Sequence, residues 1–270
     1  MRPVAITGVG LLCAAGLDPV QARARLAQGP LIPQPPPDVG VLAPLLLPLA
    51  EGFDPRKVVT RRKDLKLMAR ANRLALGAAR QALAQAGRAG HAEAGLFLAV
   101  GREPMSLREL LPVLHHSSEA GQVTLDRLID EGMHWMHPLA SLKTLPNMCV
   151  AHVAIELDLT GPTMALCDDA DMGPRALTEA ALAVSRGDAP WALAGGADAR
   201  LAFGDRLSAE TLGDGDRPLS EAAAVFVLEP LEDARARGAR VIAVLGPREG
   251  CPPVAHDRLG DCGAATLAAA

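Results

Sequence analysis

The segment of this chain that could carry covalent chemistry is residues 161–188, which read as a buried strand, a tight elbow and a helix. An elbow between a strand and a helix is a place where enzymes present a nucleophilic side chain. Ala170 holds that position here. Because a side chain that ends in a methyl group cannot act as a nucleophile, we expect no covalent catalysis through this residue.

The neighbours of Ala170 leave other chemistry open. Carboxylates surround the elbow, at Asp168, Asp169 and Asp171. They could form part of a metal site, but the interpretation that we favour is capping of the helix at 172–186, whose N-terminus attracts negative charge. Cys167 could act as a nucleophile only if the elbow were shifted by three residues, which would place the thiol within the strand. Adjacent negative charges would also suppress the thiolate that such a nucleophile needs.

Other motifs that could bind a metal or cofactor are incomplete. Histidines cluster at His115, His116, His134 and His137. Pro138 directly follows the HxxH pattern and would break the helix needed to bring two rings onto one face, so we predict no metal site. The GVG at residues 8–10 lacks the third glycine and the acidic residue of a dinucleotide-binding loop. We therefore interpret GVG as a turn and expect no cofactor.

A dense basic stretch covers residues 54–73 and continues as a helix to about residue 86, where Gly87 ends it. This stretch could be a solvated helix face, with the long side chains covering apolar surface. It could also dock an acidic partner, and a combination of Arg and Lys suits a phosphate group. The residues that we single out for docking are Arg61, Arg62, Lys63 and Lys66.

Composition narrows the class of protein. The chain has 270 residues, 49% apolar content and a net charge of −4, and it contains two Trp, four Phe and no Tyr, so we expect no nucleic-acid partner. Five cysteines without a CxxC pair favour reduced thiols and a cytoplasmic protein. The apolar run at 39–50 is interrupted by Pro44 and Pro48, so we predict no membrane span.

Strand and helix patterns alternate along the chain and predict an α/β fold. Buried strands are expected at residues 4–6, 96–100, 163–166, 191–196, 221–229 and 241–245. Further helices are expected at residues 19–28, with Asp18 as N-cap, and at 107–115, 123–131 and 231–237.

Three blocks of this sequence resemble the β-ketoacyl synthases. Residues 161–188, together with GGAD at 195–198, match the nucleophile region of that family without a gap, and the family carries Cys at the place of Ala170. The NM at Asn147 and Met148 matches a family motif, and EAAAVFVLE at 221–229 resembles the strand in which the family has EGAG before VLE. The resemblance implies a thiolase-like fold.

Past residue 245 the resemblance weakens. The family's HGTGT motif is not found, and LGDCGAATLAAA resembles its GHxxGAAG motif with Gly260 or Asp261 where the His would stand. His256 is nearby but out of register. We therefore expect a complete N-terminal half at residues 1–245 and a strongly truncated C-terminal half at 246–270.

Without the Cys and both His residues, the chain resembles a chain-length factor, most of all the short ketosynthase-like subunits of aryl-polyene clusters. The resemblance implies a non-catalytic subunit that pairs with an active β-ketoacyl synthase and receives acyl carrier protein at the basic stretch. It also implies that one strand, formed by Thr163, Met164, Ala165 and Leu166, pairs edge to edge with its counterpart in the partner. Two alternatives stay open: a stand-alone homodimer that binds acyl carrier protein or lipid, and an acyltransferase or hydrolase that uses Cys167.

Overall fold

The computed structural model describes residues 2–36, 45–89, 93–167, 171–213 and 217–245. Its centre is a mixed sheet in which the strands lie in the order β6-β3-β7-β8-β1-β9, with β2 (Leu46–Leu47) pairing separately with β8. The other strands are β1 (Val4–Leu12), β3 (Gly95–Val100), β6 (Thr163–Leu166), β7 (Ala192–Ala199), β8 (Leu219–Pro230) and β9 (Ala243–Leu245). β6, β3 and β7 are parallel, and β8, β1 and β9 join through antiparallel pairs.

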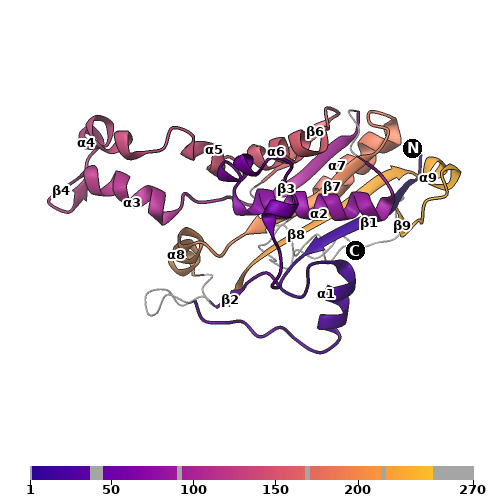
Figure 1. The fold of residues 1–270 in the computed structure, drawn as a ribbon, viewed down its shortest axis with the longest axis horizontal. Coiled ribbons are helices and arrows are strands. Elements are labelled where there is room, and N and C mark those ends of the chain that lie inside the picture. Colours follow the sequence, from indigo (N-terminus) through magenta and orange to yellow (C-terminus); the bar gives the residue numbers. More distant parts are fainter. Residues whose placement is uncertain (1, 37–44, 90–92, 168–170, 214–216, 246–270) are drawn as a thin grey trace.

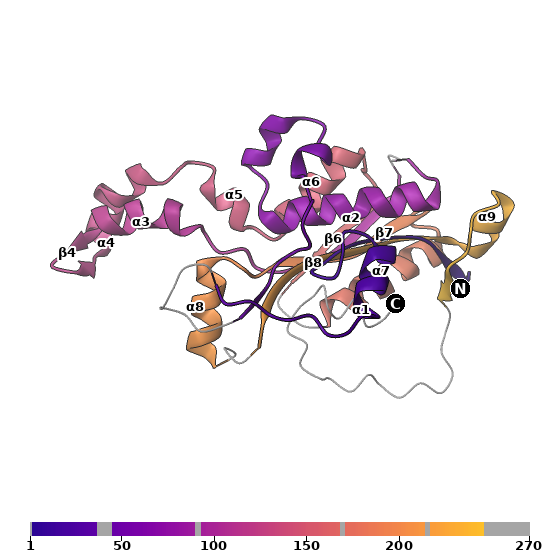
Figure 2. The same cartoon turned by 60° about the horizontal axis from the view of Figure 1, so that its bottom comes forward.

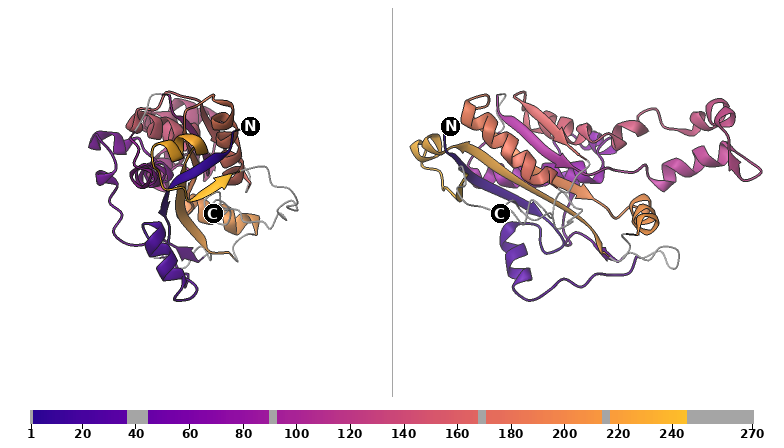
Figure 3. Two further views of the ribbon diagram at one scale, coloured as in Figure 1. Left: turned by 90° about the vertical axis from the view of Figure 1, so that its right-hand side faces the viewer. Right: turned by 180° about the vertical axis from the view of Figure 1, so that it is seen from behind.

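Helices cover both faces of the sheet. α2 (Arg70–Ala86) and α6 (Asn147–Leu157) lie together on one face, as Figure 2 shows. α7 (Met172–Arg186) lies on the opposite face, which the view from behind in Figure 3 presents. Each face has its own apolar core, one built around α2 and the other around α7. The alternating pattern of the sequence therefore predicted the layered α/β architecture correctly.

The structure corrects the interpretation of the GVG as a turn. β1 does not stop at Ile6 but continues to Leu12, so both glycines lie inside a strand, beside an irregularity in its pairing with β8. Helix α2 crosses β1 so closely that a Cβ atom at Gly10 would lie 1.8 Å from the carbonyl oxygen of Ala78. A Cβ atom at Gly8 would lie 2.1 Å from the carbonyl oxygen of Ala82. The glycines allow this close approach of helix and strand.

The ends of several elements match the expected signals. At the start of α1 (Pro19–Leu26) the amides of Val20 and Gln21 donate to Asp18 Oδ1, each at 2.8 Å, which confirms the predicted N-cap. α2 ends at Gly87, which has a left-handed φ of 63°. The basic stretch before α2 is not one continuous helix, because it forms the short 3-10 helices η1 (Pro55–Lys57) and η2 (Arg62–Lys66). Near the other end of the chain, α9 (Leu231–Ala236) lies between β8 and β9.

A helical arm, residues 107–144, projects from the body of the protein (Figure 1, left). It contains α3 (Leu107–His116), β4 (Ser118–Glu119), β5 (Gln122–Val123), α4 (Leu125–Asp130), η3 (Gly132–Trp135) and α5 (Ala140–Thr144). α3 and η3 contact each other, and the rings of His116 and Trp135 stack at 4.0 Å. α8 (Phe203–Leu212) lies near the base of the arm (Figure 1).

Candidate functional site

The strand and the helix expected within residues 161–188 are present. β6 ends at Leu166, Cys167 follows it, and α7 begins at Met172. Ala170, Asp168 and Asp169 lie outside the described residues, so their placement stays a prediction. Asp171 occupies the N-cap position of α7, but its side chain accepts no capping hydrogen bond from that helix. The capping hydrogen bond expected of Asp171 is therefore not formed, whereas its place at the N-terminus of α7 agrees with the expected attraction of negative charge to that end of the helix.

The strand predicted to form a subunit interface lies at the edge of the sheet. β6 pairs with β3 on one side, and no strand among the described residues pairs with its other side. Thr163 and Met164 are exposed, Ala165 is half-buried and Leu166 is buried. The amide of Leu96 donates to the carbonyl of Pro162 at 2.8 Å. Since parallel pairing alternates along a strand, the amide of Ala165 faces away from β3.

The basic residues singled out for docking lie together and are exposed. Arg61, Arg62, Lys63 and Lys66 all belong to η2 or precede it directly. Arg61 donates to Asp64 at 2.9 Å, whereas the other three form no ion pair with any residue that the structure describes.

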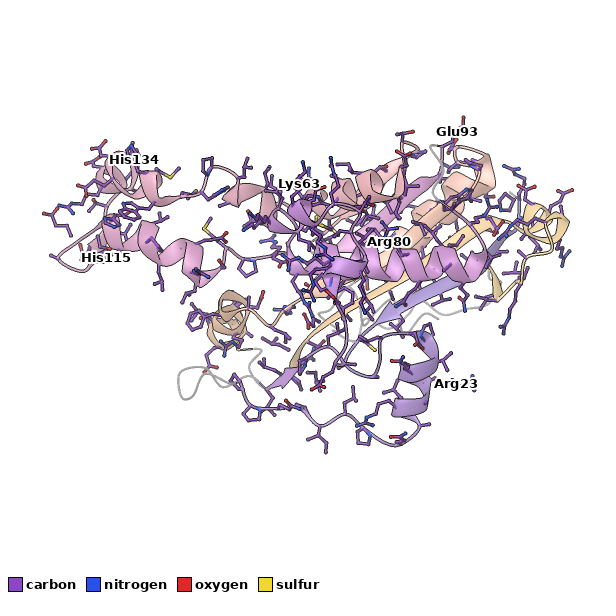
Figure 4. The ribbon with its side chains drawn as sticks, in the orientation of Figure 1. Arg23, Lys63, Arg80, Glu93, His115 and His134 are labelled. Carbon is purple, nitrogen blue, oxygen red and sulfur yellow. The ribbon has the colours of Figure 1, made fainter. Side chains whose placement is uncertain are left out.

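This basic segment is anchored to the helices behind it. The Arg80 side chain of α2 donates to the carbonyl of Val58 and lies 3.1 Å from a carboxylate oxygen of Glu156 in α6. The same carboxylate accepts a hydrogen bond from the amide of Thr60 at 2.7 Å. The chain entering η2 is thus held at a fixed place beside α6, where Lys63 is labelled in Figure 4.

Sequence reasoning missed a buried carboxylate that organises the start of α2. α2 lacks a capping side chain at Ala69, and Glu103, which follows β3, supplies the missing acceptor. Its two carboxylate oxygens accept hydrogen bonds from the amides of Arg70 and Ala71, at 2.7 and 3.2 Å. Burial raises the pKa of Glu103 even though these amides favour the charged form. No local pattern could indicate this contact, because the partners lie more than thirty residues apart.

Buried groups near Glu103 are structural in character. Arg70 forms an ion pair with Glu221 of β8 at 2.7 Å, which ties α2 to the sheet. Cys149 of α6 is fully buried, and burial, with the charge of Glu103, raises the pKa of its thiol. A thiol in that environment stays protonated and unreactive at neutral pH.

The histidines do not form a metal centre in the described part of the chain. His134 belongs to η3, whereas His137 lies beyond that helix and accepts a hydrogen bond from the amide of Leu139, so the HxxH pattern does not lie on one helix. In Figure 4 His115 and His134 lie at the far end of the arm. Across the described residues no group of three His, Cys, Asp or Glu side chains could hold a metal ion. None of the described helices has the length and apolar character needed to cross a bilayer.

The sheet, with β6 leading towards α7 and a helical layer on each face, defines a thiolase-like fold. Residues 1–213 match the N-terminal domain of β-ketoacyl synthase, and the chain belongs to that family. The crystal structure of a β-ketoacyl synthase from Burkholderia phymatum STM815 is similar, with 26% identity and a TM-score of 0.72 over 90% of this chain and 63% of that one. The ishigamide ketosynthase/chain length factor shares the fold, with 23% identity and a TM-score of 0.70 over 90% of this chain and 62% of that one.

Sequence relatives give the same family. Nodulation protein E of Rhizobium leguminosarum bv. trifolii is 28% identical over 264 residues, which cover 90% of this chain and 61% of that protein. The 3-oxoacyl-[acyl-carrier-protein] synthase 2 of Staphylococcus aureus is 29% identical over 143 residues, which cover 46% of this chain and 36% of that protein. The chain thus spans less than two thirds of the length of either relative. The predicted fold class is confirmed for the N-terminal domain, whereas Gly260, Asp261 and His256 lie outside the described residues.

Proposed function

We propose that this chain is a non-catalytic, ketosynthase-like subunit of the chain-length-factor type. It pairs with an active β-ketoacyl synthase in polyketide, polyene or specialised fatty-acid biosynthesis. The sequence feature that carries the proposal is Ala170 at the position predicted for the elbow, where a family member with condensing activity needs a nucleophile. A family member without that nucleophile can still contribute a surface and a binding cavity to a partner.

Two features of the described structure support pairing. No strand among the described residues pairs with the outer side of β6, and such an edge in proteins is commonly covered by a neighbouring strand. The arm exposes several large apolar side chains, which are Leu111, Val123, Leu125, Ile129, Met133 and Trp135. Exposed apolar surface of this kind marks interaction sites. Among similar structures, one contains a ketosynthase/chain length factor.

The test of pairing is co-purification with a co-encoded β-ketoacyl synthase, followed by size-exclusion chromatography with light scattering. We expect a 1:1 complex that buries a large apolar interface. A soluble monomer that forms no complex with any co-encoded synthase would contradict the proposal. A stable homodimer that binds no synthase would favour the alternative, a stand-alone protein that binds acyl carrier protein or lipid.

The basic segment at η2 supports a second part of the proposal, docking of acyl carrier protein. A similar structure contains a type II polyketide synthase acyl-carrier protein in complex with its ketosynthase. Arg62, Lys63 and Lys66 are exposed without ion pairs to described residues, so their charge is available to an acidic partner.

Reversing one of these charges should weaken carrier binding. For Lys63→Glu we expect the dissociation constant for the cognate carrier protein to rise by about three- to tenfold at low salt, and the difference to shrink as salt screens the charges. Arg23→Glu is the matched control, because Arg23 is exposed on α1, far from Lys63 (Figure 4), and the change in net charge is the same. Calorimetry at two salt concentrations measures both. If the two variants weaken binding equally, the basic stretch is a solvated surface and does not dock the carrier protein.

A further inference from the structure

The arm tip, residues 115–137, combines exposed apolar side chains with unpaired acidic ones. It consists of the end of α3, the hairpin of β4 and β5, α4 and η3, and its helices pack on one another at the far end of the arm (Figure 1). Leu125, Ile129 and Met133 are 69%, 59% and 47% exposed, and Trp135 is 55% exposed. No described part of the chain covers these side chains, so the tip can contact a partner.

Trp135 is held in place by the end of α3. Its indole ring stacks on the imidazole ring of His116, with the ring centroids 4.0 Å apart and the planes inclined by 4°. η3 lies so close to α3 that a Cβ atom at Gly132 would be 1.9 Å from Ser117 Oγ. An exposed aromatic ring that is fixed before binding loses little conformational entropy on binding, and Trp is enriched among the residues that dominate binding free energies. Trp135 therefore has the properties of an interface hot spot.

The charge of the arm tip is acidic. The tip has four carboxylates and one basic side chain, Arg127. Arg127 pairs with Glu119 at 3.3 Å, whereas Asp126, Asp130 and Glu131 are exposed and form no ion pair with any residue that the structure describes. These three acids lie in α4 or directly after it, in the same segment as the exposed apolar side chains. A partner that covers the tip must supply basic groups, because burying a carboxylate without a counter-charge is costly.

This charge distinguishes between the possible occupants of the tip. A second copy of this chain carries a net charge of −4, so it approaches the acidic tip against electrostatic repulsion. An acidic carrier protein is repelled in the same way. A synthase with basic side chains around an apolar pocket is attracted instead, and it matches both the charge and the apolar character of the tip.

We propose that the arm tip docks into an apolar pocket with a basic rim on the partner synthase, and that this charge match selects the synthase over a second copy of this chain. The inference rests on the proposed pairing and adds the chemistry that chooses the partner. Trp135 fills the pocket, and Asp126, Asp130 and Glu131 pair with Lys or Arg side chains on its rim.

Charge reversal tests the basic rim. Calorimetry with the co-encoded synthase, at about pH 8 and so above the usual titration range of histidine, gives the dissociation constant at low and at high salt. For Asp130→Lys we expect it to rise about tenfold at low salt, and clearly less at high salt, because salt screens the charges. Glu232→Lys is the matched control, because it makes the same change of charge on α9, at the opposite end of the molecule (Figure 1), and should leave the affinity unchanged.

The outcomes separate this inference from the pairing itself. If Asp130→Lys binds the synthase as the wild type does at low salt, the charge match is wrong while the pairing stands. If the wild type forms no complex with the synthase, both are wrong.

Variants of the stacked rings test the docking surface. Trp135→Ala should raise the dissociation constant by at least about thirtyfold at either salt concentration, as expected for a hot spot. His116→Ala should raise it by about three- to tenfold, because the indole ring loses its support, and His116→Phe should restore the affinity because it keeps a flat ring for the stack. Thermal unfolding of each isolated variant checks the fold.

Two results would exclude the tip as the surface that binds the synthase. One is a folded Trp135→Ala variant with wild-type affinity for the synthase. The other is a loss of self-association in Trp135→Ala and Asp130→Lys with an unchanged synthase complex, which would identify a second copy of this chain as the occupant.

Discussion

Glu229→Gln is expected to destabilise the folded chain by about 3–5 kcal/mol, the typical cost of breaking a buried ion pair. Glu229 of β8 is fully buried, and its carboxylate accepts hydrogen bonds from Thr7 of β1, from Arg88 after α2 and from Arg237 after α9. The carboxylate therefore connects the sheet to the ends of two helices. A neutral amide would leave both guanidinium groups without their counter-charge.

The same carboxylate predicts an acid-dependent loss of stability. Burial alone would raise the pKa of Glu229, but the hydrogen bonds from Arg237, Arg88 and Thr7 outweigh this effect and lower the pKa to about 2. The folded-state pKa thus lies below the ordinary glutamate value of 4.5. The stabilisation is therefore fully present above pH 4.5 and is lost as the pH falls towards 2.

Urea unfolding at pH 7 and at pH 3 measures both effects. Glu232→Gln is the control, because Glu232 lies in the neighbouring helix α9 and is exposed, so we expect a change within about 0.5 kcal/mol. The gap between wild type and Glu229→Gln should narrow at pH 3. If Glu229→Gln costs no more than the control at pH 7, the ion pairs contribute nothing to stability.

Ala165→Pro is expected to weaken pairing with the synthase partner by at least about a hundredfold, if the outer side of β6 forms the interface. The amide of Ala165 faces away from β3, so proline removes a donor that only a partner strand could use, and its ring obstructs that strand. Edge strands tolerate proline, so the fold itself should persist.

Ala165→Ser is the matched control, because it changes the side chain at the same place and keeps the backbone amide. Light scattering of mixtures with the synthase gives the affinity, and thermal unfolding of the isolated variant checks the fold. A Pro variant that folds and still forms the 1:1 complex would exclude β6 as the paired edge, while leaving the arm as the surface to test next.

Several features were predictable from local sequence. The strand and the helix within 161–188 follow from an apolar run and an amphipathic segment that ends at Gly187. The N-cap at Asp18 and the helix end at Gly87 depend only on contacts within a few residues. The family also followed from contiguous blocks of sequence, and the fold class followed from the family.

Only the tertiary structure decided the features that join distant segments. GVG is the interior of a strand because α2 crosses it too closely for any side chain, and nothing within the motif distinguishes that cause from a turn. Glu103 caps a helix that begins more than thirty residues earlier in the chain. The carboxylate of Glu229 joins β8 to Arg88 after α2 and to Arg237 after α9. Hydrogen bonds within one turn can be predicted from neighbouring residue types, whereas contacts between distant segments depend on how the layers pack.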